Sequence, residues 1–192
     1  MNLKILLNRV FLAIKKPYFL NIGKNVDIDY SSEIKNIKHI SIGNNVSIGK
    51  DSWIQCPEKY IRSKEKMPVI TIEDGTSIGR RAVISGVKKI HIHKNVLFGP
   101  NVYVSDHGHN YENINLPIKC QGISAAKPVE IKENTWIGIN VCILPGCTIG
   151  KNCVVGANSV VTKSFPDYCI IAGAPAKIIK KFKKGKWRQA NG

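Results

Sequence analysis

Large aliphatic residues recur at every sixth position through the second half of the chain. The ladder is unbroken over six of them: Ile131, Ile137, Ile143, Ile149, Val155 and Val161. Helices repeat apolar residues every three or four positions and half-buried strands every two, so neither explains this period. Buried strands of an ordinary sheet would not hold one phase for so long. The period predicts a parallel β-helix, in which short extended segments and tight corners stack coil on coil.

Two further positions of the hexad support this interpretation. The residue four places after each aliphatic is small or of moderate size in five cases, and only Phe165 breaks this second ladder: Thr135, Val141, Cys147, Cys153 and Ser159. Glycine directly follows three of the aliphatics, at Gly138, Gly150 and Gly156. We expect glycine where the backbone must bend sharply or where a side chain has no room.

The same phase divides the chain into three parts. Residues 1–20 interleave apolar residues with lysines and predict a short amphipathic helix. Residues 21–172 carry the hexads, with external loops predicted near 55–68 and 105–128, where the ladder is interrupted. Residues 173–192 form a basic tail that we expect to be helical. The fold class is therefore all-β, with one helix before the coil and one after it.

Composition narrows the setting. The 192 residues fit one domain, and no apolar run reaches the roughly 18–20 residues that span a membrane. The start of the chain lacks the layout of a signal peptide. Six cysteines without a CxxC pair favour free thiols in the cytoplasm rather than disulfides or a structural zinc site.

The formal charge is +16, and seven of the positive residues lie between Lys177 and Arg188. This run is compatible with a solvated tail, a phosphate-binding patch or contact with an anionic membrane surface. Nucleic-acid binding is disfavoured, because the charge is concentrated at one end and no recognition motif accompanies it.

The second predicted loop carries the candidate chemistry. It begins with His107 and His109, and histidine is the side chain best suited to proton transfer near neutral pH. Either Asp106 or Glu112 is expected to orient the base. The other histidines are interpreted as outward-facing residues of the coil: His39, His91 and His93.

Three stretches together resemble the hexapeptide-repeat acyltransferases, especially sugar O-acetyltransferases of the galactoside and maltose type. They read FGPNVYVSDHGHNY, NTWIGINVCILPGCTIGKNCVVGANSVVTKSFP and IAGAPAKIIK. The resemblance implies a left-handed parallel β-helix, a homotrimer with active sites between subunits, and acetyl transfer from acetyl-CoA to a hydroxyl of a sugar or polysaccharide precursor. A neutral imidazole would take the hydroxyl proton, and backbone N–H groups would stabilise the oxyanion. Neither a metal nor a covalent intermediate is required.

The resemblance also implies roles for individual residues. Counting from Pro100 places the base at His109, ahead of His107. Residues that match acetyl-CoA contacts are Trp136, Ile139, Ala157, Thr162, Lys177 and Lys180, the two lysines as partners of the coenzyme phosphates. Ile139 departs from the small residue that relatives often have. Ser85 falls near a position of the sugar site.

Three alternatives remain open at this point. The same base would serve an N-acetyltransferase acting on an amino sugar. A zinc enzyme like the γ-class carbonic anhydrases needs three converging histidines, and no third histidine has matching spacing. A non-catalytic trimeric scaffold would bind partners through its basic tail and would not bind coenzyme A.

Overall fold

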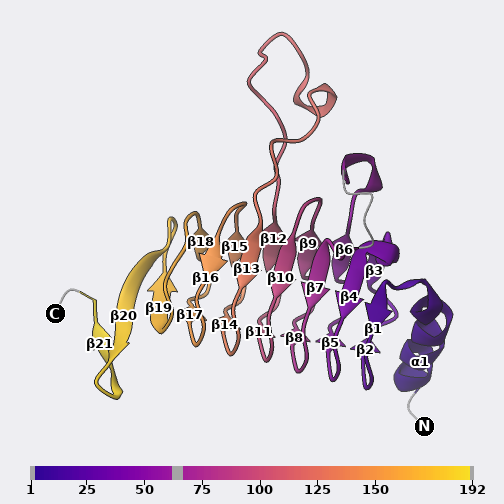
Figure 1. Ribbon diagram of the computed structural model, residues 1–192, viewed down its shortest axis with the longest axis horizontal. Coiled ribbons are helices and arrows are strands. Elements are labelled where there is room, and N and C mark those ends of the chain that lie inside the picture. Colours follow the sequence, from indigo (N-terminus) through magenta and orange to yellow (C-terminus); the bar gives the residue numbers. More distant parts are fainter. Residues whose placement is uncertain (1–2, 62–66, 191–192) are drawn as a thin grey trace.

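The computed structural model describes residues 3–61 and 67–190, and its centre is a coil of three parallel sheets. Sheet A contains β1 (Asn21–Ile22), β4 (Ile40–Ile42), β7 (Ile70–Ile72), β10 (Ile90–Ile92), β13 (Val129–Ile131) and β16 (Thr148–Ile149). Sheet C contains β3 (Glu33–Lys35), β6 (Trp53–Gln55), β9 (Val83–Ser85), β12 (Tyr103–Ser105), β15 (Cys142–Ile143) and β18 (Val160–Val161). Figure 1 shows the coils stacked along the long axis of the molecule.

Sheet B lies between these two in chain order and continues into the tail. It contains β2 (Asp27–Ile28), β5 (Ser47–Ile48), β8 (Ser77–Ile78), β11 (Leu97–Phe98), β14 (Trp136–Ile137), β17 (Val154–Val155), β19 (Cys169–Ala172), β20 (Lys177–Lys183) and β21 (Lys186–Gln189). Each coil passes from sheet A to B to C. We call the turn from sheet B to sheet C the B–C corner, and the turn from sheet C to the next strand of sheet A the C–A corner.

The hexad aliphatics stack on one another from coil to coil, which confirms the predicted repeat. In sheet A, Ile72 pairs with Ile92, and Ile92 pairs with Ile131. All three side chains are fully buried. Because each buried isoleucine contributes about 1.5–3 kcal/mol, the stack is the main source of stability. The two external loops leave this register intact, since Ile42 pairs with Ile72 across the first and Ile92 pairs with Ile131 across the second.

The corners use asparagine for left-handed backbone and glycine for close approach. Asn140 and Asn158 have φ of 56° and 57°, a conformation that asparagine tolerates better than most residues. Their amides form a ladder, with Asn140 Nδ2 donating to Asn158 Oδ1 at 3.0 Å. A Cβ on Gly150 would lie 2.3 Å from the backbone N of Asp167. The glycine at this hexad position is therefore required for space.

The helix expected near the N-terminus is α1 (Leu3–Lys15), followed by the 3₁₀ turn η1 (Lys16–Tyr18). Asn8 lies on the buried face of α1 and fixes the helix to the first coil. Its side chain donates to Asp27 Oδ1 at 3.0 Å and accepts the backbone N–H of Tyr30 at 3.0 Å. No helix among the described residues has both the length and the apolar character needed to cross a membrane.

The prediction of a helical tail is wrong. β20 runs antiparallel to β19, and β21 runs antiparallel to β20. Without the tail, the outer edge of β19 would leave its backbone N–H and C=O groups unpaired. β20 supplies these groups with partners. Lys184 and Gly185, with φ of 48° and 74°, form the two-residue connection of this hairpin. Adjacent positive φ values are typical of a type I′ turn, so the sequence Lys-Gly was the missed signal.

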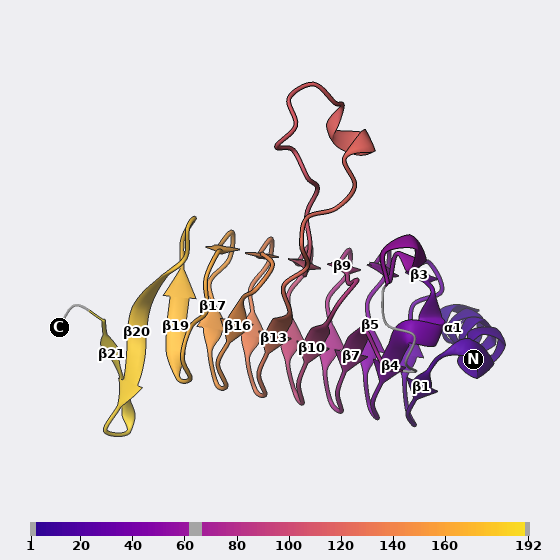
Figure 2. The same ribbon diagram turned by 45° about the horizontal axis from the view of Figure 1, so that its top comes forward.

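Two segments project from the C–A corner. One follows β6 and includes η3 (Glu58–Tyr60), and the other joins β12 to β13 and includes η4 (Ile118–Cys120). A third 3₁₀ turn, η2 (Ile37–His39), lies at the same corner of the first coil. Figures 1 and 2 show the segment between β12 and β13 extending far from the coil.

Candidate active site

The C–A corner contains a cleft of about 900 Å³. Both projecting segments contribute to its walls, together with the turn before β10. Its lining includes Lys59, Tyr60, Lys88, Lys89, Ile123 and Ser124. Three of these residues are lysines, so this part of the surface is positively charged. The cleft lies where the histidine-bearing loop leaves the coil.

Asp106 anchors the start of that loop. The side chain is fully buried, and its carboxylate accepts three backbone N–H groups of the preceding C–A turn. The closest are those of Lys88 and Lys89, at 2.7 and 2.8 Å from Oδ2. The backbone O of Asp106 accepts the N–H of Lys127 at 2.8 Å, where the loop returns. One residue thus ties both ends of the loop to the turn beneath it.

The same carboxylate holds His107. The distance between Asp106 Oδ1 and His107 Nδ1 is 2.8 Å, and the imidazole is about one-tenth exposed. Ser105 Oγ donates to the backbone O of His107 at 2.8 Å, which fixes the residue from the other side. Burial would raise the pKa of Asp106, but the His107 hydrogen bond and the backbone N–H donors outweigh it and lower the pKa. Asp106 is therefore a carboxylate at neutral pH.

His109 differs from His107 in its surroundings. Its backbone forms an antiparallel bridge with Ile123, the cleft-lining residue on the returning side of the loop. Its side chain is exposed, and the structure gives the ring no hydrogen bond or ion pair with any described residue. His107 is thus the oriented imidazole and His109 the accessible one. Of the two carboxylates expected to orient a base, Asp106 contacts an imidazole, while Glu112 is exposed farther along the loop.

Three residues matched to acetyl-CoA lie together at or beside the B–C corner. Ile139 and Ala157 occupy equivalent positions on successive coils, and the backbone O of Ile139 accepts the N–H of Asn158 at 2.9 Å. Trp136 lies on β14 just before this corner and is half exposed. Ile139 is also exposed, so its bulk projects outward rather than into the coil. These residues form one exposed strip along stacked corners.

The remaining predicted residues are spread over other elements. Thr162 is exposed directly after β18, and Lys177 and Lys180 lie on β20 of the hairpin. Ser85, matched to the sugar site, is buried at the end of β9 and accepts a hydrogen bond from Gln55 Nε2 at 3.2 Å. It pairs in register with Ser105, two residues before His107. Ser85 and the histidines therefore share the C–A corner. Of the coenzyme-matched residues, Thr162 lies at this corner on a later coil, and the others lie at or beside the B–C corner or on the hairpin.

The outward-facing histidines of the coil were predicted correctly, but their partners were missed. His91 and His93 contact Glu73 and Glu130 on the neighbouring coils. The signal was available in the sequence, since the hexad phase aligns Glu73 with His93 and Glu130 with His91. All six cysteines are free, and burial raises the pKa of Cys153 to about 11, which makes it an unreactive core residue.

The chain is similar to known proteins over most of its length. Residues 128–163 match the family described as bacterial transferase hexapeptide (six repeats). A probable acetyltransferase of Mycobacterium tuberculosis is 38% identical over 159 residues, covering 83% of this chain and 49% of that protein. The chain spans between about half and three fifths of the length of curated relatives that it matches.

Two solved structures extend the comparison. AntD, an N-acyltransferase from Bacillus cereus solved with dTDP and 3-hydroxybutyryl-CoA, superposes with a TM-score of 0.74 at 26% identity, covering 90% of this chain and 88% of that one. A maltose O-acetyltransferase from Clostridium difficile 630 gives a TM-score of 0.61 at 27% identity, covering 93% and 84%. The resemblance to hexapeptide-repeat acyltransferases is confirmed.

Proposed function

Because this chain carries bacterial transferase hexapeptide repeats and resembles acetyltransferases over most of its length, we propose that it is an acetyl-CoA-dependent acetyltransferase. The acceptor we propose is a hydroxyl of a sugar or polysaccharide precursor. The observation that carries the proposal is the pair of histidines at the start of a loop beside an open, basic cleft.

His109 is the proposed general base. A base must come within hydrogen-bond reach of the hydroxyl that it deprotonates, and the exposed His109 ring meets this requirement better than the nearly buried His107. The bridge to Ile123 holds the His109 backbone beside the cleft wall. His107, paired with Asp106, positions the loop. Deprotonation of the attacking hydroxyl contributes about 10²–10⁴-fold to the rate, and the leaving coenzyme A thiol requires no metal.

We propose that acetyl-CoA lies along the B–C corner strip, with its pantetheine arm beside Trp136, Ile139 and Ala157. Thr162 lies at the C–A corner after β18 and is a separate proposed contact, and Lys177 and Lys180 are the proposed partners of the phosphates. This assignment is supported by the exposed side chains of Ile139 and Ala157, which occupy equivalent positions on successive coils. AntD was solved with coenzyme A and with 3-hydroxybutyryl-CoA.

A homotrimer with a left-handed coil completes the proposal. In one chain the histidines occupy the C–A corner and the coenzyme strip occupies the B–C corner, on opposite edges of sheet C. Packing of neighbouring copies would bring a B–C corner against a C–A corner. The loop between β12 and β13 also carries exposed apolar residues far from its own coil, including Tyr111, Ile114 and Ile118. Such a loop gains burial when it lies against a second copy.

A second candidate is N-acetylation of an amino sugar. The similarity to AntD, whose structures include complexes with dTDP-4-amino-4,6-dideoxyglucose, favours it specifically. The same imidazole would deprotonate an ammonium or amine acceptor. The two candidates differ in the nucleophile and share the fold, the coenzyme and the cleft.

One assay separates these possibilities. Thiol release from acetyl-CoA is followed with matched pairs of acceptors, each a sugar and the amino sugar that replaces one hydroxyl by an amine. Faster release with the hydroxyl member supports the O-acetyltransferase, and faster release with the amine member supports the N-acetyltransferase. Failure of acetyl-CoA to bind would overturn both and leave a trimeric scaffold.

A further inference from the structure

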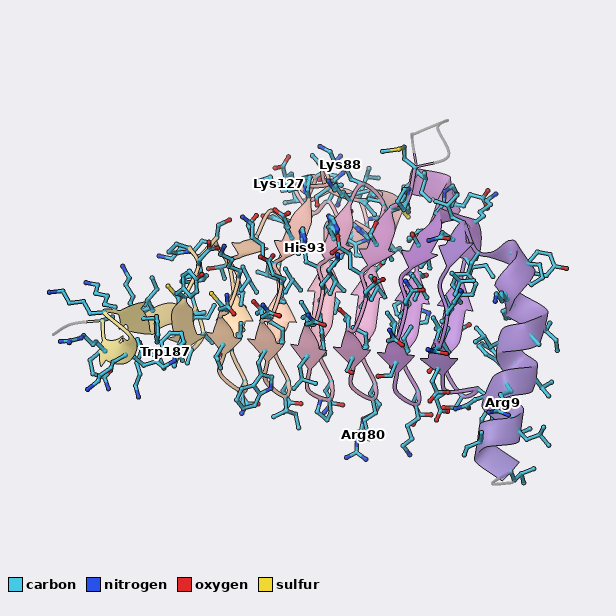
Figure 3. All side chains as sticks on the ribbon, turned by 60° about the horizontal axis from the view of Figure 1, so that its bottom comes forward. Arg9, Arg80, Lys88, His93, Lys127 and Trp187 are labelled. Atoms are coloured by element: carbon cyan, nitrogen blue, oxygen red, sulfur yellow. The ribbon has the colours of Figure 1, made fainter. Side chains whose placement is uncertain are left out.

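Two histidines project together from the outer face of sheet A. His91 lies in the middle of β10, and His93 follows directly after that strand. Because side chains two residues apart in an extended chain point to the same side, the sequence His-Ile-His places both rings outside the coil and Ile92 inside it. The rings stack, with centroids 3.9 Å apart and an interplanar angle of 17°. In Figure 3, His93 lies on the coil, and Lys88 and Lys127 lie at its edge.

Carboxylates of the two neighbouring coils flank this pair. Glu73 comes from the preceding coil, and its Oε1 lies 2.7 Å from His91 Nε2 and 3.7 Å from His93 Nδ1. Glu130 comes from the following coil, and its Oε1 lies 2.8 Å from His93 Nε2. The four side chains are between one fifth and two fifths exposed, so an ion from solution can reach them.

We propose that Glu73, His91 and His93 form a binding site for a divalent transition-metal ion, of which zinc is the best match. One ligand atom from each of the three lies within 4.8 Å of the others, and no other group of this kind occurs among the described residues. Zinc bonds of about 2.0–2.2 Å place tetrahedral ligand atoms roughly 3.3–3.6 Å apart. The distance between Glu73 Oε1 and His93 Nδ1 is close to this range.

Glu130 holds the ring of His93 in place. A hydrogen bond from His93 Nε2–H to Glu130 fixes the tautomer in which Nδ1 carries a lone pair, and Nδ1 is the nitrogen on the side of Glu73. Carboxylates that hold the far nitrogen of a ligating histidine orient the ring and increase its basicity. When an ion binds, the His91 hydrogen bond to Glu73 is replaced, and the His91 proton resides on Nδ1.

The donor set limits the identity of the ion. Two imidazoles and one carboxylate suit zinc and other first-row transition metals, whereas calcium and magnesium prefer oxygen ligands. Three protein ligands leave a fourth position of tetrahedral zinc for water or another small ligand. His91 also lines the 900 Å³ cleft, so the proposed ion site lies at the wall of that cleft. Glu73, His91 and His93 contact one another and not His107 or His109, and the site does not depend on the acetyltransferase assignment.

Zinc binding to the whole chain tests the proposal. The protein is prepared free of metal in a Cys120→Ser background, because the exposed Cys120 thiol is another potential zinc ligand. Zinc is then titrated against a competing chromophoric chelator. We expect one tightly bound ion per chain. His91→Ala and His93→Ala should each weaken binding at least tenfold, and cobalt should give the visible absorption of a tetrahedral nitrogen–oxygen site in the parent protein alone.

Matched variants separate coordination from folding. His39→Ala removes another partly exposed coil histidine and should leave zinc binding unchanged. Glu73→Gln keeps the size of the side chain and a hydrogen bond to His91, so a folded Glu73→Gln protein with weakened zinc affinity supports coordination. Binding that survives His91→Ala and Glu73→Gln would overturn the proposal. So would the absence of tight binding in the parent protein, in which case the cluster serves only as hydrogen bonds between coils.

Discussion

The chain contains two His-X-His pairs, and their contrast shows how backbone context decides what a histidine can do. On the strand, His91 and His93 point the same way, stack and are flanked by carboxylates of adjacent coils. On the loop, His107 turns inward to Asp106 while His109 remains exposed. The same His-X-His spacing therefore gives a cluster with a shared carboxylate partner on the strand. On the loop it gives two histidines with separate roles.

The largest expected effect tests the loop pair. His109→Ala should lower kcat by about 10²–10⁴-fold, because the attacking hydroxyl loses its base, while acetyl-CoA still binds. Steady-state kinetics with direct measurement of acetyl-CoA binding checks this. His107→Ala should cost less and should act through the position of the loop. A larger loss in His107→Ala would exchange the roles of the two histidines, and near-full activity in both variants would exclude the histidine mechanism.

The next effect concerns the carboxylate that distinguishes the two loop histidines. Asp106→Asn should reduce the free energy of unfolding by about 1–3 kcal/mol, since an amide accepts these backbone N–H groups less well than a carboxylate. The folded-state pKa of Asp106 is lowered. Its contribution is therefore fully present above the unfolded value near pH 4 and is lost as the pH falls through the lower folded value.

Thermal unfolding followed across acidic pH tests this linkage. The difference in Tm between parent and Asp106→Asn protein should be constant at neutral pH and should narrow below about pH 4. A difference that is independent of pH down to the acid limit would show that the variant acts through packing rather than through the lost charge.

A variant on β20, outside both histidine pairs, tests the proposed contacts with the coenzyme phosphates. Lys177→Glu combined with Lys180→Glu should raise the KM for acetyl-CoA several-fold and leave the acceptor KM nearly unchanged, because the coenzyme carries the phosphates. The matched control combines Lys183→Glu with Lys186→Glu. These two residues pair at the far end of the same hairpin. The effect should shrink at high salt, where exposed charges are screened. An equal effect in the control would indicate nonspecific attraction by the tail.

The smallest effect tests the strand pair without metal. In chelator, Glu73→Gln should change the free energy of unfolding by no more than about 0.5 kcal/mol, because partly exposed ionic contacts contribute little. Its kcat should match that of the parent, since Glu73 contacts His91 and His93 and not the proposed base His109. Chemical denaturation and the thiol-release assay give the two numbers. A large fall in kcat would place the strand pair in the catalytic site.

The coil could be predicted because the residue types within each hexad indicate its strand and its corner without reference to distant parts of the chain. An inward aliphatic such as Ile143 and a small residue such as Cys147 suffice, whatever the rest of the chain does. The tail could not be predicted in the same way. The segment KIIKKFK is compatible with a helix or a strand, and the unpaired edge of β19 decides in favour of the strand. That edge exists only after the coil has formed.

The candidate site could also be predicted only in part: the sequence indicated its histidines but not the contacts that hold them. The loop histidines can be recognised by their type and position. Only the folded corner shows that the Asp106 carboxylate accepts hydrogen bonds from three backbone N–H groups and also contacts His107. The contact of Glu130 with His93 joins two coils that are separated by an external loop, so the register had to be followed across that loop. Glu73 lies on the coil directly before the histidines, and its contact required only the register of adjacent coils.

The C-terminal hairpin has a consequence for association between molecules. A stack of parallel strands that ended at β19 would present a template on which the first strands of another molecule could add, and repeated addition builds a fibre. The hairpin occupies that template and covers it with seven positive charges of one sign. Two such ends carry like charges, so we expect the lysines that we assign to coenzyme phosphates also to oppose end-to-end addition of a second molecule.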